Sequence, residues 1–158
     1  MLISTIFGGK MVIRYEGVPF VARFRWSVGE VFDEFLKALK DMKLLASKCK
    51  CGYIVFPPRI RCPKCSIKLE KDNLVTLDGK GIIESYTRVY FKLDGNGNEI
   101  WLEKPETLAM IRFNNANSVV VLPSFDPEIK EGDEVEIVWK EERTGSLSDI
   151  LGVRKVRK

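Results

Sequence analysis

The sequence predicts a mainly β protein with one N-terminal helix, in which a cysteine-containing ribbon precedes a small five-stranded barrel. Three observations predict it: helical apolar spacing over residues 28–39, four cysteines within seventeen consecutive residues, and five β-rich segments after residue 72. They divide the 158 residues into an N-terminal extended segment with the helix (1–45), a ribbon (46–72) and a barrel (73–158).

The N-terminal segment is expected to be extended over residues 11–25 and helical after that. Ser27 and Glu30 have the spacing of a capping box, and the helix is expected to end near Lys43. The apolar face of this helix could pack on the chain's own core or bind a partner. The candidate residues for partner binding are Trp26, Phe32 and Phe35.

The four cysteines form two close pairs, Cys49 with Cys51 and Cys62 with Cys65. Each pair supplies two thiolates from one turn, and the chain between the pairs can fold back to bring the turns together around one metal ion. Because the chain has no histidine, the site would be all-sulfur, closed and structural, and zinc is the expected metal. A disulfide, free thiols or a rubredoxin-type iron site are the alternatives.

One feature of this cysteine pattern is unusual. A single residue separates Cys49 from Cys51, which is fewer than such pairs normally have. The shorter loop can still reach one metal ion, but it changes which backbone N–H groups point at the sulfurs.

From residue 73 onward the sequence predicts five strands separated by short turns. The first is long, follows Gly79 and Gly81, and ends at a turn over residues 94–98. The expected strands are Ile82–Leu93, Leu108–Phe113, Ser118–Leu122, Val135–Trp139 and Leu151–Val156. Five strands of this kind fit the oligonucleotide/oligosaccharide-binding (OB) barrel best.

The distribution of charge separates the ribbon from the barrel. Residues 48–71 carry a net charge of +6, whereas residues 72–149 carry −8. The basic ribbon favours nucleic-acid binding, but an OB groove for nucleic acid should itself be positive, so nucleic acid is not the expected partner. With no histidine and no paired catalytic motif, independent catalysis is not expected either. No apolar run has the length of a membrane span and no secretory leader is recognised, so we expect a cytoplasmic protein.

The order of these segments resembles a known family. Phe56-Pro57-Pro58-Arg59 lies between the cysteine pairs, the second pair reads Cys-Pro-x-Cys, and a helix precedes and a barrel follows them. From about residue 20 onward the chain resembles the DUF35 family, which combines a rubredoxin-like zinc ribbon with an OB fold. The single residue between Cys49 and Cys51 departs from the family's usual two.

The resemblance implies a non-catalytic role in acyl-CoA metabolism. Archaeal members of the family are associated with acetoacetyl-CoA thiolase and 3-hydroxy-3-methylglutaryl-CoA (HMG-CoA) synthase. There they resemble a scaffold that bridges the two enzymes and helps to hold the CoA moiety of the shared intermediate. A thiolase, an HMG-CoA synthase and CoA are therefore the expected partners.

Three basic residues of the ribbon and three aromatic residues of the first barrel strand are candidates for contact with CoA. The basic side chains could bind its phosphates, and the rings could flank its adenine or pantetheine. The alternative for the aromatic residues is the barrel core, and for Arg59 a structural hydrogen bond across the ribbon. The six candidates are Arg59, Arg61, Lys64, Tyr86, Tyr90 and Phe91.

Overall fold

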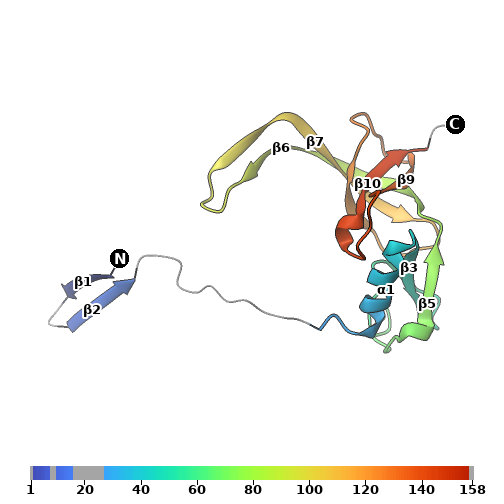
Figure 1. Cartoon of the computed structure of the whole chain (residues 1–158), viewed down its shortest axis with the longest axis horizontal. Helices are drawn as coiled ribbons and strands as arrows, with labels where there is room; N and C mark the ends of the chain where they lie inside the picture. Colours follow the sequence, from blue (N-terminus) through green and yellow to red (C-terminus); the bar gives the residue numbers. More distant parts are fainter. Residues whose placement is uncertain (1, 8–9, 16–26, 157–158) are drawn as a thin grey trace.

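The structure, a computed structural model, describes residues 2–7, 10–15 and 27–156. Near the N-terminus, β1 (Leu2–Phe7) and β2 (Lys10–Tyr15) pair with each other in an antiparallel hairpin. The remainder of the segment expected to be extended, and the candidate Trp26 that follows it, lie outside the described residues. From residue 27 onward, one α-helix, a three-stranded sheet and a barrel follow (Figure 1).

The C-terminal half forms a closed five-stranded barrel, as predicted. Around the barrel the strands follow the order β10-β8-β7-β6-β9, and the pairing of β9 with β10 closes it. Strand β10 is parallel to β8, and the other pairs are antiparallel. The strands are β6 (Lys80–Leu93), β7 (Glu99–Phe113), β8 (Val120–Ser124), β9 (Glu134–Trp139) and β10 (Ile150–Lys155).

A smaller antiparallel sheet, ordered β4-β3-β5, carries the cysteine turns. Strand β3 (Leu44–Lys48) pairs on one side with β4 (Ile54–Val55) and on the other with β5 (Leu74–Leu77). A 3-10 turn, η1 (Lys71–Asn73), leads into β5. Because β5 pairs with β3 and not with a barrel strand, the sheet of the ribbon extends past the expected boundary at residue 72.

Helix α1 (Glu30–Lys40) starts differently from the expectation. Gly29 is the N-cap, with φ of 75°, and no side chain caps the first turn, so the predicted capping box of Ser27 and Glu30 is wrong. Glu30 and Asp33 instead place negative charge near the positive end of the helix dipole. With 11 residues α1 is too short to cross a membrane, and the described part of the chain has no other helix that could.

One continuous hydrophobic core joins the helix, the small sheet and the barrel. Phe35 of α1 packs edge-to-face on Phe56 of the ribbon, and Phe56 packs in the same way on Phe113 of β7, with ring centroids 5.8 and 5.2 Å apart. The prediction that Phe35 binds a partner is wrong, because its side chain is completely buried at the centre of this core. Phe32 is only partly buried and stays a candidate.

The loop between β9 and β10 holds the C-terminal end of α1. Arg143 Nε donates to the carbonyl oxygen of Lys40 at 2.9 Å and satisfies one acceptor of the last helical turn. Asp149, fully buried, accepts the backbone N–H groups of residues 144–146. Burial alone would raise the pKa of this carboxyl, but these donors lower it. Gly145 is required here, because its φ is +80° and a Cβ would press against α1.

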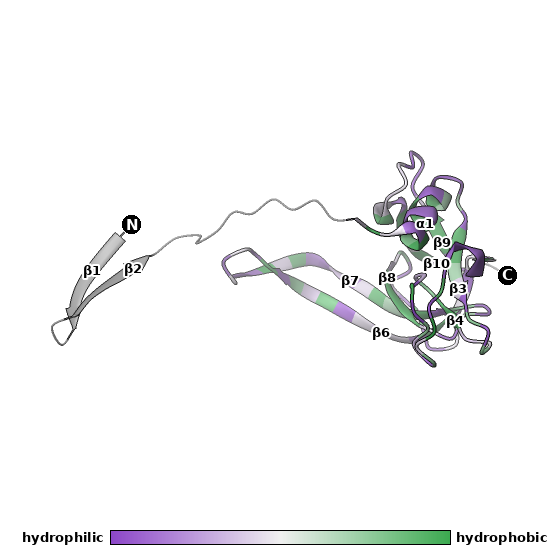
Figure 2. Ribbon diagram, turned by 90° about the horizontal axis from the view of Figure 1, so that it is seen from below, coloured by the Kyte–Doolittle hydropathy of each residue, from purple (hydrophilic) through white to green (hydrophobic). Residues whose placement is uncertain are grey.

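Strands β6 and β7 continue beyond the barrel as a two-stranded arm, defined here as residues 89–106 (Figures 1 and 2). Strand β9 pairs with β6 only over Lys80–Ile82, and β8 pairs with β7 only over Thr107–Ile111. Tyr90 and Phe91 lie on this arm, Tyr86 lies on β6 just before it, and all three side chains are exposed. The alternative that these three rings belong to the barrel core is therefore wrong.

Candidate metal centre and basic groove

The four cysteine sulfurs lie within 4.8 Å of one another. The shortest separations join the two turns: Cys49 Sγ lies 3.4 Å from Cys65 Sγ, and Cys51 Sγ lies 3.7 Å from Cys62 Sγ. Thiolates at roughly 2.3 Å from a tetrahedral zinc would be about 3.8 Å apart, so the observed spacing fits this metal. All four cysteines are free of disulfides, and the site is the predicted four-thiolate zinc centre.

Each cysteine turn is closed by backbone hydrogen bonds. In the first turn, Gly52 N–H donates to the carbonyl oxygen of Cys49 at 2.9 Å, and the φ of +85° at Gly52 suits glycine. In the second turn, Ser66 N–H donates to the carbonyl oxygen of Cys62 at 2.9 Å. The second turn holds Ser66 itself at φ of 59°. Each turn therefore presents its two sulfurs from a backbone that is held by a hydrogen bond, although the first turn is one residue shorter than the second.

The two turns provide different backbone donors to their buried sulfurs, one to Cys49 and two to Cys62. The N–H of Cys51 lowers the pKa of Cys49, but burial and contact with the other thiols outweigh it and raise this pKa to about 12. Burial raises the pKa of Cys62, but the N–H groups of Cys65 and Lys64 and the neighbouring thiols lower it to about 7. A bound cation takes the place of the protons that the four sulfurs would otherwise share.

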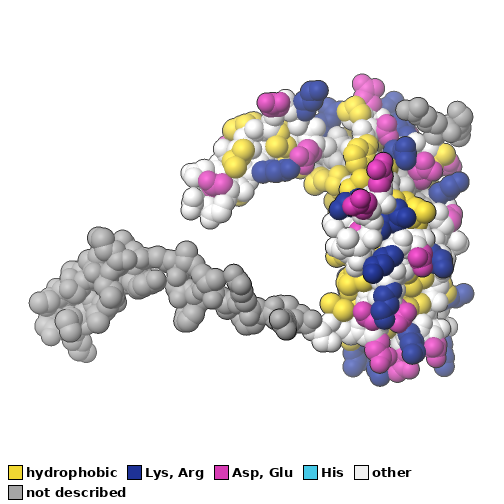
Figure 3. Space-filling view, in the orientation of Figure 1, with side chains coloured by type: hydrophobic (Ala, Val, Ile, Leu, Met, Phe, Trp, Pro, Cys, Tyr) yellow, Lys and Arg dark blue, Asp and Glu magenta, His cyan; other side chains and the backbone are white. Residues whose placement is uncertain are grey.

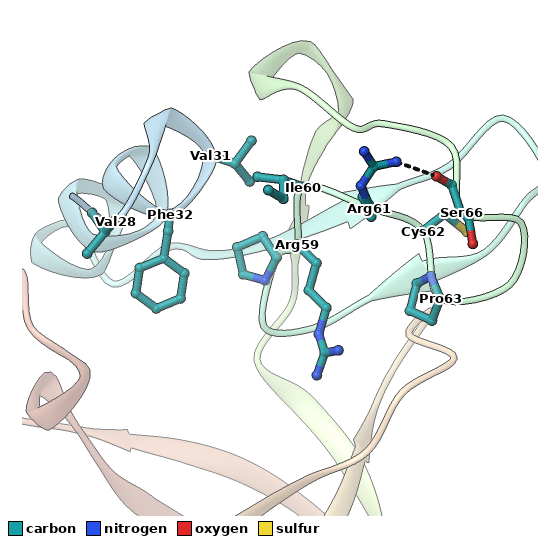
Figure 4. A pocket seen from close by; sticks show the side chains of 10 residues that line it. Val28, Val31, Phe32, Arg59, Ile60, Arg61, Cys62, Pro63 and Ser66 are labelled. Atoms are coloured by element: carbon teal, nitrogen blue, oxygen red, sulfur yellow. Dashed lines mark hydrogen bonds between the residues drawn. The ribbon is translucent and has the colours of Figure 1, made fainter. Parts of the chain in front are cut away.

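A groove of about 500 Å³ lies beside the metal centre, between the start of α1 and the chain that follows Pro57 (Figure 4). Val28 and Phe32 form its wall on the helix side, and the second cysteine turn lies at its other end. Arg59 and Arg61 cross it with Ile60 between them. The groove is therefore apolar on the helix side, and two arginines line the other side with their guanidinium groups pointing in opposite directions (Figure 4).

The two arginines of the groove are held differently. Arg61 donates from a guanidinium nitrogen to the carbonyl oxygen of Ser66 at 3.2 Å. The backbone N–H of Arg59 donates to the hydroxyl of Ser47 at 3.1 Å. The Arg59 guanidinium itself has no hydrogen bond or ion pair within residues 27–156. Arg59 thus makes the expected structural hydrogen bond with its backbone N–H, and its charged guanidinium remains available to bind a ligand.

The structure does not bring all six candidate CoA-contact residues together. Lys64 is exposed on the second cysteine turn and is not among the residues that line the groove. Tyr86 lines a separate cavity of about 140 Å³ on the barrel, and Tyr90 and Phe91 lie farther out on the arm. Arg59 and Arg61 therefore share one site, and the three aromatic residues belong to another region.

Comparison with known proteins places the chain in a family. The family model of the ChsH2 rubredoxin-like zinc ribbon domain matches residues 36–70. A DUF35 domain-containing scaffold protein of Methanothermobacter thermautotrophicus is 35% identical over 103 residues, which cover 63% of this chain and 74% of the relative. The chain belongs to the DUF35 family. Another DUF35 domain-containing scaffold protein, from Pyrococcus furiosus, is 33% identical over 103 residues, 64% of this chain and 71% of the relative.

Solved structures support the same fold for this DUF35 protein. A crystal structure of a DUF35-family protein of unknown function from Sulfolobus solfataricus matches with a TM-score of 0.60 and 30% identity, covering 81% of this chain and 87% of that one. The structure described as the Ltp2-ChsH2(DUF35) aldolase matches with a TM-score of 0.57 over 83% of this chain and 98% of that one. At 20% identity this second match shows the fold alone.

Sequence reasoning missed the apolar part of the groove in this DUF35 protein. Ile60 is exposed between two arginines, and Pro63 follows Cys62 at the end of the groove. An isoleucine between two charged residues in a basic segment was the available signal. This signal predicts a groove only once the start of α1 is known to lie opposite Ile60.

Proposed function

We propose that this DUF35 protein is a non-catalytic scaffold that joins a thiolase and an HMG-CoA synthase, or a related thiolase-like enzyme. We further propose that its groove receives the CoA moiety of the intermediate that such enzymes share. The observation that carries the proposal is the groove itself, in which Arg59 and Arg61 lie opposite the apolar side chains of Val28 and Phe32.

The relatives support an assembly role. Two of them are named scaffold proteins, and the name of the Ltp2-ChsH2(DUF35) aldolase combines a DUF35 domain with an enzyme. The chain's own residues also favour a binding role over a catalytic one. It contains no histidine, and its four cysteines are gathered in one closed metal site.

The chemistry of CoA suits the groove. CoA carries phosphates at one end and a largely neutral pantetheine arm at the other. Guanidinium groups bind phosphate oxygens with two parallel hydrogen bonds, and the free guanidinium of Arg59 can do so without breaking an existing bond. Val28, Phe32 and Ile60 offer apolar contact to the arm. The acidic barrel would repel the phosphates, which favours their placement on the ribbon.

Co-purification tests the scaffold role. The tagged chain is co-expressed with the thiolase and the HMG-CoA synthase of its own host, and the complex is analysed by size-exclusion chromatography with light scattering. We expect both enzymes to co-elute with the chain, and the two enzymes to separate when it is left out. Elution of all three proteins as separate species would contradict the scaffold proposal.

Removal of the two groove arginines is expected to weaken CoA binding. In R59A/R61A, each lost charged hydrogen bond should reduce affinity by about tenfold to a hundredfold, because such bonds contribute roughly 1.5–3 kcal/mol. Isothermal titration with CoA measures the change, on the free chain and on the enzyme complex. The control is K130A/K140A, which removes two exposed lysines outside both the groove and the arm of β6 and β7. Equal CoA affinity in both double variants would place CoA elsewhere.

Nucleic-acid binding is the second candidate, because the ribbon carries a net charge of +6. The −8 of residues 72–149 opposes it, since a nucleic-acid groove tracks phosphates with positive charge. Fluorescence anisotropy with a labelled oligonucleotide at physiological salt distinguishes the two functions. Tight, salt-dependent binding by the ribbon would favour nucleic acid over CoA.

A further inference from the structure

The arm of β6 and β7 exposes large apolar side chains on both of its faces. Phe91 lies opposite Trp101, with ring centroids 5.4 Å apart, so the two rings share one face. Lys92 lies opposite Ile100, and because side chains alternate along a strand, this pair lies on the other face. Trp101 is 67% exposed and Ile100 is 55% exposed. Neither face of the arm is covered by the described part of the chain.

This exposure is concentrated on the arm. Five of the seventeen exposed large hydrophobic residues of the described chain lie there, and Figure 3 shows apolar side chains along it. Large apolar side chains exposed together on one element mark a protein interaction site more often than a solvated surface. An isolated two-stranded hairpin is also only marginally stable in water, so a partner would stabilise it. The five residues are Tyr90, Phe91, Leu93, Ile100 and Trp101.

The outer end of the arm is negatively charged. Residues 93–103 contain Asp94, Glu99 and Glu103 and no basic residue. Asp94 is occupied in the turn, where it accepts the N–H groups of Asn96 and Asn98, but Glu99 and Glu103 are exposed and have no ion pair within residues 27–156. Two arms meeting end to end would therefore bring like charges together. The charge favours a partner with basic residues where this end is received.

We propose that the arm is the element that docks this scaffold onto its enzyme partner, by inserting into a cleft with apolar walls and lysine or arginine side chains at its bottom. Insertion follows from the two exposed faces, because a flat partner surface would cover only one of them. The basic residues at the bottom follow from the three carboxylates at the outer end. The inference rests on the proposed function and names the surface through which that function operates.

Two double variants test the inference in the co-expression experiment with thiolase and HMG-CoA synthase. F91S/W101S removes the apolar pair, and E99K/E103K reverses the charge of the outer end. We expect each to reduce the amount of co-purified enzyme at least tenfold while the melting temperature of the free chain stays near that of the wild type, because none of these residues belongs to the core. The matched controls are I67S/L147S and E141K/E142K, which make the same changes at exposed positions outside the arm and should retain the enzyme.

The outcomes separate the inference from the proposed function. If the wild type and both arm variants capture the enzyme equally, the arm is not the docking element and the scaffold role stands. If the wild type captures neither enzyme, both proposals fall together. Analytical ultracentrifugation of the free chain tests whether a second copy of this chain covers the arm instead. A wild-type dimer that F91S/W101S converts to a monomer would show this and would overturn the inference.

Discussion

Replacing Cys62 with serine is expected to remove bound zinc and to lower the melting temperature by roughly 10 °C or more. Cys62 is buried, and its sulfur lies with the other three around one point. Structural zinc contributes roughly 10–16 kcal/mol of apparent binding free energy in small zinc domains, and losing one ligand forfeits much of it. At this chain length, each kcal/mol corresponds to about 2–4 °C. Metal analysis of the purified protein and thermal unfolding followed by circular dichroism measure both effects.

Lys64 provides the control for this experiment. It lies in the same turn but its exposed side chain is not a ligand, so Lys64→Ala should keep one zinc per chain and a wild-type melting temperature. Chelation of the wild type should reproduce the effect of Cys62→Ser. A wild-type protein that contains no metal, or a Cys62→Ser variant with full metal content and stability, would contradict the assignment of the site.

Replacing Phe35 with alanine is expected to lower the free energy of unfolding by about 3–5 kcal/mol, which is the usual cost of removing a fully buried phenylalanine. The ring of Phe35 is completely buried and is the helix's contribution to the row of rings that continues through Phe56 to Phe113. Its removal leaves a cavity where the helix, the small sheet and the barrel meet. Urea unfolding monitored by circular dichroism measures the loss.

The neighbouring Phe32 distinguishes packing from partner binding. Its ring lies 5.4 Å from that of Phe35 but is only partly buried and faces the groove. Phe32→Ala should therefore cost clearly less stability than Phe35→Ala, because less apolar surface is removed from the core. If Phe35→Ala left stability unchanged and abolished enzyme capture instead, the burial of this residue would be disproved.

The barrel and the metal centre were predictable because their signals are local. Alternating strands separated by Gly- and Asn-rich turns, and two close cysteine pairs, depend on residues near one another in the sequence. The short strands β3 and β5 were not predicted, because their residues show no clear alternation and the two strands form by pairing with each other, Leu44 with Leu77 and Ser47 with Leu74. The outer part of β7 was missed because it contains Pro105 and three charged neighbours, and only pairing with β6 makes it a strand.

The corrections at the helix and the groove have the same origin. An amphipathic pattern shows that one face of α1 is apolar but not which parts of that face are covered. Phe35 and Phe32 look equivalent in the sequence, and only the position of Phe56 makes the first buried and leaves the second at the groove. The groove depends on how far the start of α1 lies from Ile60, and that distance is set by the tertiary fold.

The hydrogen bond from Arg143 to Lys40 has a consequence for how the chain is made. The two residues are 103 positions apart, and the loop of Arg143 needs the buried Asp149 to hold its shape. During synthesis the N-terminal half emerges from the ribosome long before Arg143 and Asp149 do. The end of α1 therefore lacks this partner until nearly the last strand has been released, and the nascent helix and ribbon stay without part of their native contacts for most of translation.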